Sequence, residues 1–458
     1  MDGIFAGIPP LEALRYLVHR AATVDHRGVG EDKVMMINDV ARAFFEAKAT
    51  RPICIELPEE ARTEADVQQD MVGLLKMSLY GTRDAALNWQ EEVGREMKSW
   101  GFVRGKFNPC IYYHEQWGVE VLVHGDDFVS VGNREKIKEF KEKLEQRFEI
   151  KTTVIGKGVD EKPEGRILNR VVRRTEAGWE YEPDQRHAEM IIEDLGLKDA
   201  KPVATPGEDE KKWEAEENAE ELDPAKASAY RRIAARANYL ATDRPDIMYS
   251  TKEICRWMAK PTVGGWRKLK RLGRYLLGST RTILKYEWQG EEEELTAYTD
   301  SDWAGCKVTG RSTSGGALVI GKHFIRGWAK SQNSVALSSA EAELTAMVKT
   351  SCESIGMMAM AKDLGKKLKT IVFADSSAAL AITKRKGNGK LRHINIGMLW
   401  LQEKEARGEL EFEKVKGESN PADLCTKYLN KDKANMFSEL LGQSVVQGRA
   451  DVGLQVQH

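Results

Sequence analysis

The sequence predicts a multidomain protein with α/β and α+β domains. Its 458 residues are enough for two to four domains, each with a buried core. Between residues 291 and 430, five short apolar stretches alternate with helical patterns, which is typical of an α/β domain with a mixed five-stranded sheet. Residues 224–290 show helical periodicity instead, and the chain before them combines apolar hairpins with helices.

Composition places the chain among soluble globular proteins. Hydrophobic residues make up 41% of it, charged residues make up 31%, and the formal net charge is −1. No apolar run is long enough to span a bilayer and the start lacks a secretory signal, so we expect a cytoplasmic or nuclear location without membrane contact. The six cysteines lack paired CxxC spacing, which argues against a zinc site or a disulfide framework.

Three acids follow predicted strands in the first part of the chain. The buried strand Val34–Ile37 is followed by Asn38-Asp39. An apolar hairpin, Val119–Val131, turns at Asp126-Asp127. Taken alone, this turn is weak evidence of a site, because turns favour glycine and aspartate for conformational reasons.

Helices are expected through the middle of the chain. They are predicted at residues 9–26, from about Trp89 to Trp100, at 133–148, 184–195 and 230–240, from Arg244-Pro245-Asp246-Ile247 onward, and at 266–277. In the helix 133–148, Ile137, Phe140, Leu144 and Phe148 form a stripe at spacings of three and four, which indicates core packing. A hairpin is expected between Arg166 and Tyr181, and residues 208–223 have the Glu, Lys and Ala composition of a solvated linker.

Four further acids occupy positions that would bring them together in the C-terminal α/β domain. Asp300 follows the strand Leu295–Thr299, Glu343 lies in a helix that Ser338 can cap, Asp375 follows the strand 370–374, and Asp423 opens a C-terminal helix. Carboxylates that share a small pocket need cations to stay ionised, and magnesium or manganese prefers such oxygen ligands. The arrangement predicts a two-metal phosphodiesterase site, with ions about 3.5–4 Å apart. The alternative is that these are ordinary solvated acids.

This domain resembles the ribonuclease H domain of copia-type retrotransposon Pol polyproteins. The segments TDSDWAG, GRSTSGG, VALSSAEAEL, FADSSAALAI, LRHINI and NPADLCTK each resemble a family motif, and they occur in the family's order. The resemblance implies that Asp300, Glu343, Asp375 and Asp423 hold two Mg²⁺ or Mn²⁺ ions and that the domain cleaves RNA in RNA/DNA hybrids. Selectivity for RNA would come from contacts to 2′-hydroxyls.

The first part of the chain resembles the reverse transcriptase of the same family. Val40–Phe45 resembles the segment after the first catalytic aspartate, and Ser78-Leu79-Tyr80-Gly81 with Trp89 resembles the second palm motif. The resemblance implies a palm in which Asp39, Asp126 and Asp127 hold metal ions for polymerisation. The chain departs from the family at Asp84, Ala86 and Leu87, and at His124-Gly125 before the aspartate pair.

These departures lead us to expect weak or absent DNA polymerisation. Only 38 residues precede Asp39, so the fingers region is expected to be largely missing. Asp84 adds a negative charge where the family has a neutral amide near the nucleotide, and like charges repel a triphosphate. The expected domains are a partial palm at 1–155, a thumb-like segment at 156–207, an acidic linker at 208–223, a helical connection at 224–290, a ribonuclease H-like domain at 291–430 and a polar tail at 431–458.

Two basic clusters are candidates for contact with the nucleic-acid backbone. Arg267, Lys268 and Lys270 recur on a helix-like period, and the run from Lys384 contains Arg392 and His393, the latter at a position that resembles one of the family. Each cluster has the alternative interpretation of a solvated surface.

The sequence therefore predicts a C-terminal fragment of a copia-type Pol polyprotein. It would hydrolyse the RNA of RNA/DNA hybrids with two divalent ions and retain a vestigial RNA-directed DNA polymerase. The alternative is an inactive or host-adopted remnant that binds nucleic acid without chemistry. All seven predicted metal ligands are present, which favours the enzyme. The sequence does not determine the oligomeric state.

Overall fold

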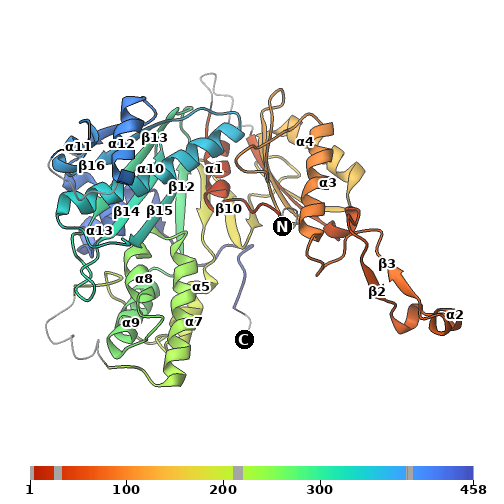
Figure 1. Ribbon diagram of the computed structural model, residues 1–458, viewed down its shortest axis with the longest axis horizontal. Coiled ribbons are helices and arrows are strands. Elements are labelled where there is room, and N and C mark those ends of the chain that lie inside the picture. Colours follow the sequence, from red (N-terminus) through yellow and green to blue (C-terminus); the bar gives the residue numbers. More distant parts are fainter. Residues whose placement is uncertain (1–4, 25–32, 210–219, 388, 390–395, 457–458) are drawn as a thin grey trace. The chain divides into compact units, whose positions relative to one another are not determined.

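The computed structural model describes residues 5–24, 33–209, 220–387, 389 and 396–456 (Figure 1). The chain separates into two compact units. The first unit consists of Met1–Leu17, Asp32–Lys162 and Ala359–Lys366, and the second consists of Val18–Glu31, Pro163–Met358 and Lys367–His458. None of the helices in the described ranges combines the length and apolar character needed to cross a membrane.

The first unit is built on a six-stranded sheet in the order β4-β5-β6-β7-β1-β8. The strands are β1 Lys33–Val40, β4 Val103–Arg104, β5 Ile111–His114, β6 Val119–His124, β7 Asp127–Asn133 and β8 Ile150–Ile155, and each neighbouring pair is antiparallel. Helix α1 (Glu12–Ala21) is divided between the two units after Leu17, and the first unit also contains helices α3 (Ala85–Ser99) and α4 (Arg134–Arg147). Ile137, Phe140 and Leu144 of α4 are buried in its core, which confirms the predicted stripe.

A two-stranded arm lies between β1 and α3 in the sequence and was not predicted. Strands β2 (Cys54–Glu56) and β3 (Val72–Leu74) pair antiparallel, and helix α2 (Glu64–Gln68) lies between them in the sequence (Figure 1). The side chain of Thr63 accepts from the Asp66 N–H while Asp66 accepts from the Thr63 N–H, a reciprocal cap at the start of α2. The short 3-10 helices Ala43–Glu46 and Glu59–Ala61 also belong to this region.

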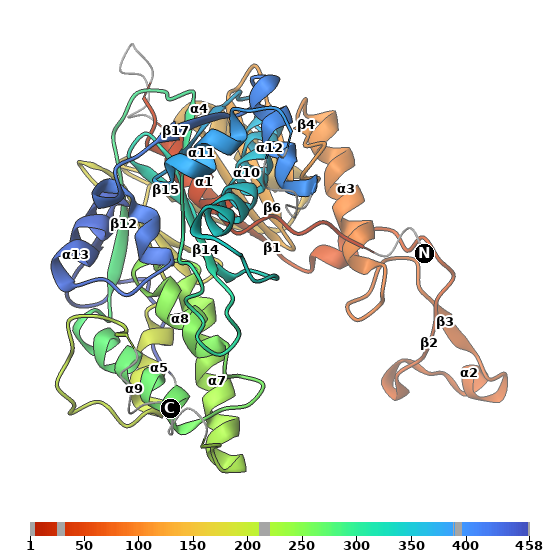
Figure 2. The same ribbon diagram turned by 60° about the vertical axis from the view of Figure 1, so that its left-hand side comes forward.

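The second unit contains an antiparallel sheet in the order β18-β12-β11-β10-β9 and a group of helices. The strands are β9 Glu164–Ile167, β10 Arg170–Arg174, β11 Gly178–Glu182, β12 Thr282–Glu287 and β18 Gln443–Val445. The helices are α5 Arg186–Asp194, α7 Pro224–Ala241, α8 Met248–Cys255 and α9 Val263–Gly278 (Figure 2), with the 3-10 helix Pro245–Ile247 before α8. The helices confirm the predicted periodicity of residues 224–277.

Two strands of that sheet come from segments with a different expectation. β12 lies inside the connection that was predicted as helical, and β18 lies in the segment 431–458 that was expected to be a polar tail. The same segment contains helix α13 (Lys431–Leu440), whose N-terminus is capped by the side chain of Asn430. Of the predicted linker 208–223, residues 210–219 lie outside the described ranges.

The second sheet of this unit is the predicted mixed five-stranded sheet. Its order is β15-β14-β13-β16-β17, with β13 Glu294–Ser301, β14 Thr313–Ile320, β15 His323–Ser331, β16 Lys369–Ala374 and β17 Glu411–Lys414. β13 runs antiparallel to β14 and parallel to β16, and β17 is parallel to β16. Helices α10 (Ser339–Asp363), α11 (Ser377–Thr383) and α12 (Ile396–Ala406) complete the domain, together with the 3-10 helices Gly417–Ser419 and Pro421–Cys425. The predicted mixed fold class is therefore confirmed.

Candidate metal and nucleic-acid sites

The topology of the mixed sheet brings Asp300 and Asp375 to one edge. Neighbouring parallel strands β13 and β16 both run toward this edge, with Tyr298 opposite Phe373 in the register. Asp300 is two residues beyond Tyr298, and Asp375 immediately follows the last residue of β16. The carboxyl ends of parallel strands are where open α/β sheets place ligand-binding side chains.

Helix α10 supplies the third acid, Glu343. The Ser338 hydroxyl accepts a hydrogen bond from the Glu341 N–H at 3.3 Å, as the predicted cap requires. The Ser301 N–H donates to Glu343 Oε1 at 3.3 Å, which ties the carboxylate to the strand that carries Asp300. Gln332 steadies the same junction, since its amide donates to the hydroxyls of Ser301 and Ser314.

Asp300, Glu343 and Asp375 form a carboxylate cluster. One oxygen of each lies within 4.8 Å of the others. Asp300 is 1% exposed and Glu343 is 8% exposed, and Glu343 Oε2 has no hydrogen-bond partner within the described part of the chain. Burial raises the pKa of Asp300 to about 6, and burial together with Asp300 and Asp375 raises the pKa of Glu343 to about 9. Three converging hard oxygen donors without enough compensating charge fit a divalent cation.

Asp423 reaches the same region by a different route from the one predicted. It lies in the short 3-10 helix Pro421–Cys425, and the C-terminal α-helix starts only at Lys431, so the prediction that Asp423 opens that helix is wrong. Asn420 explains the local turn, because its side chain accepts from the Ala422 N–H and donates to the Thr299 carbonyl at 2.9 Å. Asp423 is 2% exposed, comparable with Asp300 at 1%, whereas Asp375 is only half-buried.

Two lysines hold Asp423 in place. Lys427 Nζ lies 2.7 Å from Asp423 Oδ1 and 3.3 Å from Asp300 Oδ2, and Lys433 Nζ lies 2.6 Å from Asp423 Oδ2. Thr426 adds a short hydrogen bond from its hydroxyl to Asp300 Oδ2. None of these three residues was predicted from the sequence, although Thr426 and Lys427 lie inside the motif NPADLCTK, which marks them as candidates.

The first unit gathers Asp39, Asp126 and Asp127. Asp39 and Asp127 are directly opposite each other in the β1–β7 pair, and the Val40 N–H donates to the Asp126 carbonyl at 3.1 Å. Gly125 turns the hairpin with φ +63°, and its carbonyl accepts from Trp89 Nε1 at 2.8 Å. Asp39 and Asp126 are exposed, whereas partial burial and the charges of Asp126 and Asp39 raise the pKa of Asp127.

Asp84 does not present a free negative charge. Its carboxylate is 3% exposed and accepts from Arg51 Nε at 3.0 Å and from Arg51 Nη2 at 2.9 Å. The Arg51 hydrogen bonds hold the pKa of Asp84 at about 2, so the acid is ionised but paired. The expectation that Asp84 repels a triphosphate rested on an unpaired charge and is therefore not supported by this geometry.

Helix α9 carries the first basic cluster. It starts after Thr262, whose hydroxyl accepts from the Gly265 N–H at 3.1 Å. Lys270 is exposed, and Arg267 and Lys268 are half-buried. These three residues line a hollow of about 310 Å³ that is also lined by Arg271, Arg274 and Tyr428. Tyr428 directly follows Lys427 in the sequence, so one residue that lines this hollow is the neighbour of a residue in the acidic site. Arg392 and His393 lie outside the described residues.

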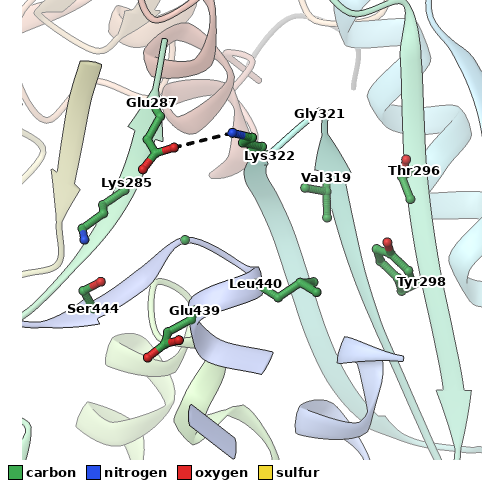
Figure 3. Close-up of a pocket in the computed structure, with 11 residues that line it drawn as sticks. Lys285, Glu287, Thr296, Tyr298, Val319, Gly321, Lys322, Glu439, Leu440 and Ser444 are labelled. Carbon is green, nitrogen blue, oxygen red and sulfur yellow. Dashed lines mark ion pairs between the residues drawn. The ribbon is translucent and has the colours of Figure 1, made fainter. Parts of the chain in front are cut away.

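A separate hollow of about 600 Å³ lies beside β12, β13, β14 and α13 (Figure 3). Lys285, Tyr298 and Glu439 are among its lining residues, and Lys322 Nζ lies 3.8 Å from Glu287. None of the seven predicted metal ligands lines it. It is therefore distinct from the acidic sites.

Comparison with known proteins identifies the family. The reverse transcriptase (RNA-dependent DNA polymerase) family matches residues 2–209. The retrovirus-related Pol polyprotein from transposon TNT 1-94 of Nicotiana tabacum is 28% identical over 96% of this chain and 33% of that protein. The chain belongs to the copia-type Pol family. The Pol polyprotein from transposon RE2 of Arabidopsis thaliana is 27% identical over 91% of this chain and 28% of that protein.

This copia-type Pol chain spans about a third of the length of these curated relatives. It also matches the uncharacterized mitochondrial protein AtMg00810 of Arabidopsis thaliana, with 36% identity over 37% of this chain and 68% of that protein. Among solved structures, a foamy viral protease-reverse transcriptase in complex with RNA/DNA hybrid is 11% identical, with a TM-score of 0.47 over 88% of this chain and 45% of that one. LC11-RNase H1 is 18% identical, with a TM-score of 0.22 over 29% of this chain and 93% of that one.

Proposed function

We propose that the second unit of this copia-type Pol chain is a metal-dependent ribonuclease that cleaves RNA paired with DNA. The convergence of Asp300, Glu343 and Asp375 at one sheet edge is the observation that carries the proposal. Among the proteins similar to this chain, one is described as an RNase H1 and another as a reverse transcriptase in complex with an RNA/DNA hybrid. RNA paired with DNA is proposed as the substrate because the chain belongs to the copia-type Pol family.

The acidic residues would hold two divalent ions. Such ions supply an activated water for attack on the phosphodiester and stabilise the departing oxygen. Asp300, Glu343, Asp375 and Asp423 would provide the oxygen donors, and the Ser301 N–H would orient Glu343. The buried Glu343 takes part only in its ionised form, which its raised pKa makes dependent on neighbouring positive charge.

Helix α9 would contact the phosphate backbone of the same substrate. Its cations Arg267, Lys268 and Lys270 line one hollow, and that hollow includes Tyr428, the neighbour of Lys427. Phosphate contacts position a nucleic acid without reading its sequence, so this surface suits a nuclease that accepts many sequences. Arg392 and His393, which lie outside the described residues, are proposed to contact phosphate as well.

The test is cleavage of a labelled RNA/DNA hybrid by the purified chain, with Mg²⁺ and with a chelator. We expect Mg²⁺-dependent cutting of the RNA strand that Asp375→Asn abolishes while the circular dichroism spectrum stays unchanged. Glu411→Gln, which removes an exposed acid from the neighbouring strand β17, is the matched control and should cleave normally. Equal cleavage by the wild type and Asp375→Asn would refute the assignment. Hybrid binding without any cleavage would favour the inactive remnant.

A second proposed activity is RNA-directed DNA polymerisation by the first unit. It is favoured by the position of Asp39 directly opposite Asp127 in the β1–β7 pair and beside the backbone of Asp126. We expect weak extension, because Asp39 and Asp126 are exposed and, among the described residues, these three acids do not form a close carboxylate group like that of Asp300, Glu343 and Asp375. Primer extension on an RNA template with Mg²⁺ and then Mn²⁺ measures it. Robust extension that Asp126→Asn abolishes would overturn the expectation of weak activity.

A further inference from the structure

Lys427 occupies the space between two of the proposed metal ligands. Its Nζ is within 3.3 Å of both Asp423 and Asp300, although both carboxylates are only 2% exposed. Asp423 is therefore held by ammonium groups, whereas the cluster within 4.8 Å comprises Asp300, Glu343 and Asp375. The fourth ligand is separated from the other three by a positive charge of the chain itself.

We propose that Lys427 is a built-in cation at the place of the second divalent ion and must swing out before that ion binds. The proposal rests on the two-ion function proposed above. It makes ion binding sequential, since the cluster of Asp300, Glu343 and Asp375 is open to a first ion. The second ion competes with Lys427 for Asp300 and Asp423.

Charge and exposure explain why Lys427 can play this part. An uncompensated buried carboxylate is costly, so Asp423 needs a positive partner whenever no ion is bound. The Lys427 side chain is 43% exposed, and its ammonium group lies at the end of a flexible four-carbon chain. The ammonium can therefore move into water without unfolding of the 3-10 turn. Lys433 contacts Asp423 alone and is 33% exposed, so it can keep one partner on Asp423 while Lys427 leaves.

Among the described residues, Lys433 contacts Asp423 alone, and Lys427 is the cation whose ion pairs join Asp423 to Asp300. Lys414 donates to the Asp375 backbone carbonyl and to the Ser377 hydroxyl at 2.7 Å, and no contact links it to a ligand carboxylate. Lys414 is therefore a matched control, an ammonium next to the site that does not occupy an ion position.

The experiment measures Mn²⁺ binding to the full chain by titration calorimetry and by the paramagnetic resonance of free Mn²⁺. All variants carry Asp39→Asn, Asp126→Asn and Asp127→Asn, so that the predicted metal ligands of the first unit do not contribute. We expect Lys427→Met to tighten the weaker of two ribonuclease-site constants by roughly tenfold, the scale of one close charge pair, and to change the tighter constant little. Lys427→Arg should restore the wild-type value, and Lys414→Met should have no effect.

The outcomes separate the two proposals. If the chain with a native Lys427 binds two ions and Lys427→Met leaves the weaker constant unchanged, the role of Lys427 is refuted while the two-ion site stands. Weakening of both constants would show a structural role and also refute it. Absence of Mn²⁺ binding in every variant would refute the two-ion function itself. Lys427→Gln serves if Lys427→Met lacks the wild-type circular dichroism spectrum.

Discussion

The two acidic sites of this chain differ in burial and in the way their charge is compensated. In the ribonuclease-like site, Asp300, Glu343 and Asp423 are each less than a tenth exposed. In the palm-like site, Asp39 and Asp126 are exposed and only Asp127 is partly buried. The first site lies where strand ends, helix α10 and a 3-10 helix meet. The second lies at the two-residue turn between β6 and β7 and at the end of β1.

The difference shows what a buried carboxylate requires. Buried acids must gain a proton, an ion or a basic partner, and the ribonuclease-like site uses Lys427 and Lys433 as partners. An exposed carboxylate can stay ionised in water without a basic partner. Accordingly, no pair of lysines comparable to Lys427 and Lys433 contacts Asp39 and Asp126 in the described part of the chain. The carboxylates of a buried site are thus held in position before ions bind, whereas the carboxylates of an exposed site become ordered only when ions and substrate bind.

The largest expected effect is a separation of the two sites by single substitutions. Asp300→Asn should lower hybrid cleavage by roughly a thousandfold, because it removes a charge that aligns the ions. Asp39→Asn should leave cleavage within about twofold, because it lies in the other compact unit. Initial cleavage rates at saturating Mg²⁺ measure both, and an equal loss in the two variants would contradict the independence of the sites.

A pH-dependent loss of stability is expected in the unit that contains the buried site. His323 is fully buried, its Nδ1 lies 2.8 Å from His19 Nδ1, and its Nε2 lies 2.7 Å from the Glu287 carbonyl. Burial lowers the pKa of His323 to about 4 from an ordinary 6.5. The folded state therefore keeps it neutral, while the unfolded state takes up a proton as the pH falls below 6.5.

The stabilising contribution is complete above pH 6.5 and is lost as the pH falls toward 4. From pH 7 to pH 5 the loss should be about 2 kcal/mol for this residue. Urea titrations at pH 7 and pH 5, with the protection of the β15 amides from hydrogen exchange as the probe, measure this loss in the free energy of unfolding. His323→Gln retains a donor toward the Glu287 carbonyl and does not titrate, so it should flatten the pH dependence. An unchanged dependence would assign the effect to other groups.

The basic surface on α9 should respond differently from the acidic sites. Changing Arg267, Lys268 and Lys270 to alanine should weaken hybrid binding and reduce the slope of log affinity against log salt by roughly 0.7–0.9 per lost phosphate contact. Glu343→Gln is the useful contrast, because it changes the ion site and should leave that slope nearly intact. Fluorescence anisotropy at several salt concentrations gives the slopes. An unchanged slope in the triple variant would show that α9 is only a solvated face.

The remaining expected effect concerns Asp84 and is confined to the first unit. Asp84→Asn should destabilise the first unit by about 1–3 kcal/mol, because the Arg51 contacts are weakened at a buried position. It should not improve primer extension, since the charge it removes is already paired. Thermal unfolding and extension assays test the two halves of the prediction. Faster extension by Asp84→Asn would restore the view that this charge repels the nucleotide.

Much of both sites could be predicted from local pattern. Asp300 and Asp375 follow apolar strands, Glu343 follows a serine cap, and Asp126 and Asp127 lie at the tip of an apolar hairpin. Apolar side chains recur every two residues in a half-buried strand and every three to four residues in a helix, so the sequence alone indicates where strands end and helices begin. The alternation of five apolar stretches with helical patterns predicted a mixed five-stranded sheet, and the strand order came from the tertiary structure.

What only the tertiary structure decided involves residues distant in sequence. Asp84 pairs with Arg51, β12 is completed by β18 across more than 150 residues, and Lys427 bridges to Asp300. Such pairs depend on which surfaces become buried together. Burial removes the water around a charge, which makes an unpaired charge costly and a contact with an opposite charge strong. No periodicity in the chain carries that information. The sequence by itself indicated that Asp300, Glu343 and Asp375 lie close together, and the tertiary structure decided which basic groups balance the acids of this site.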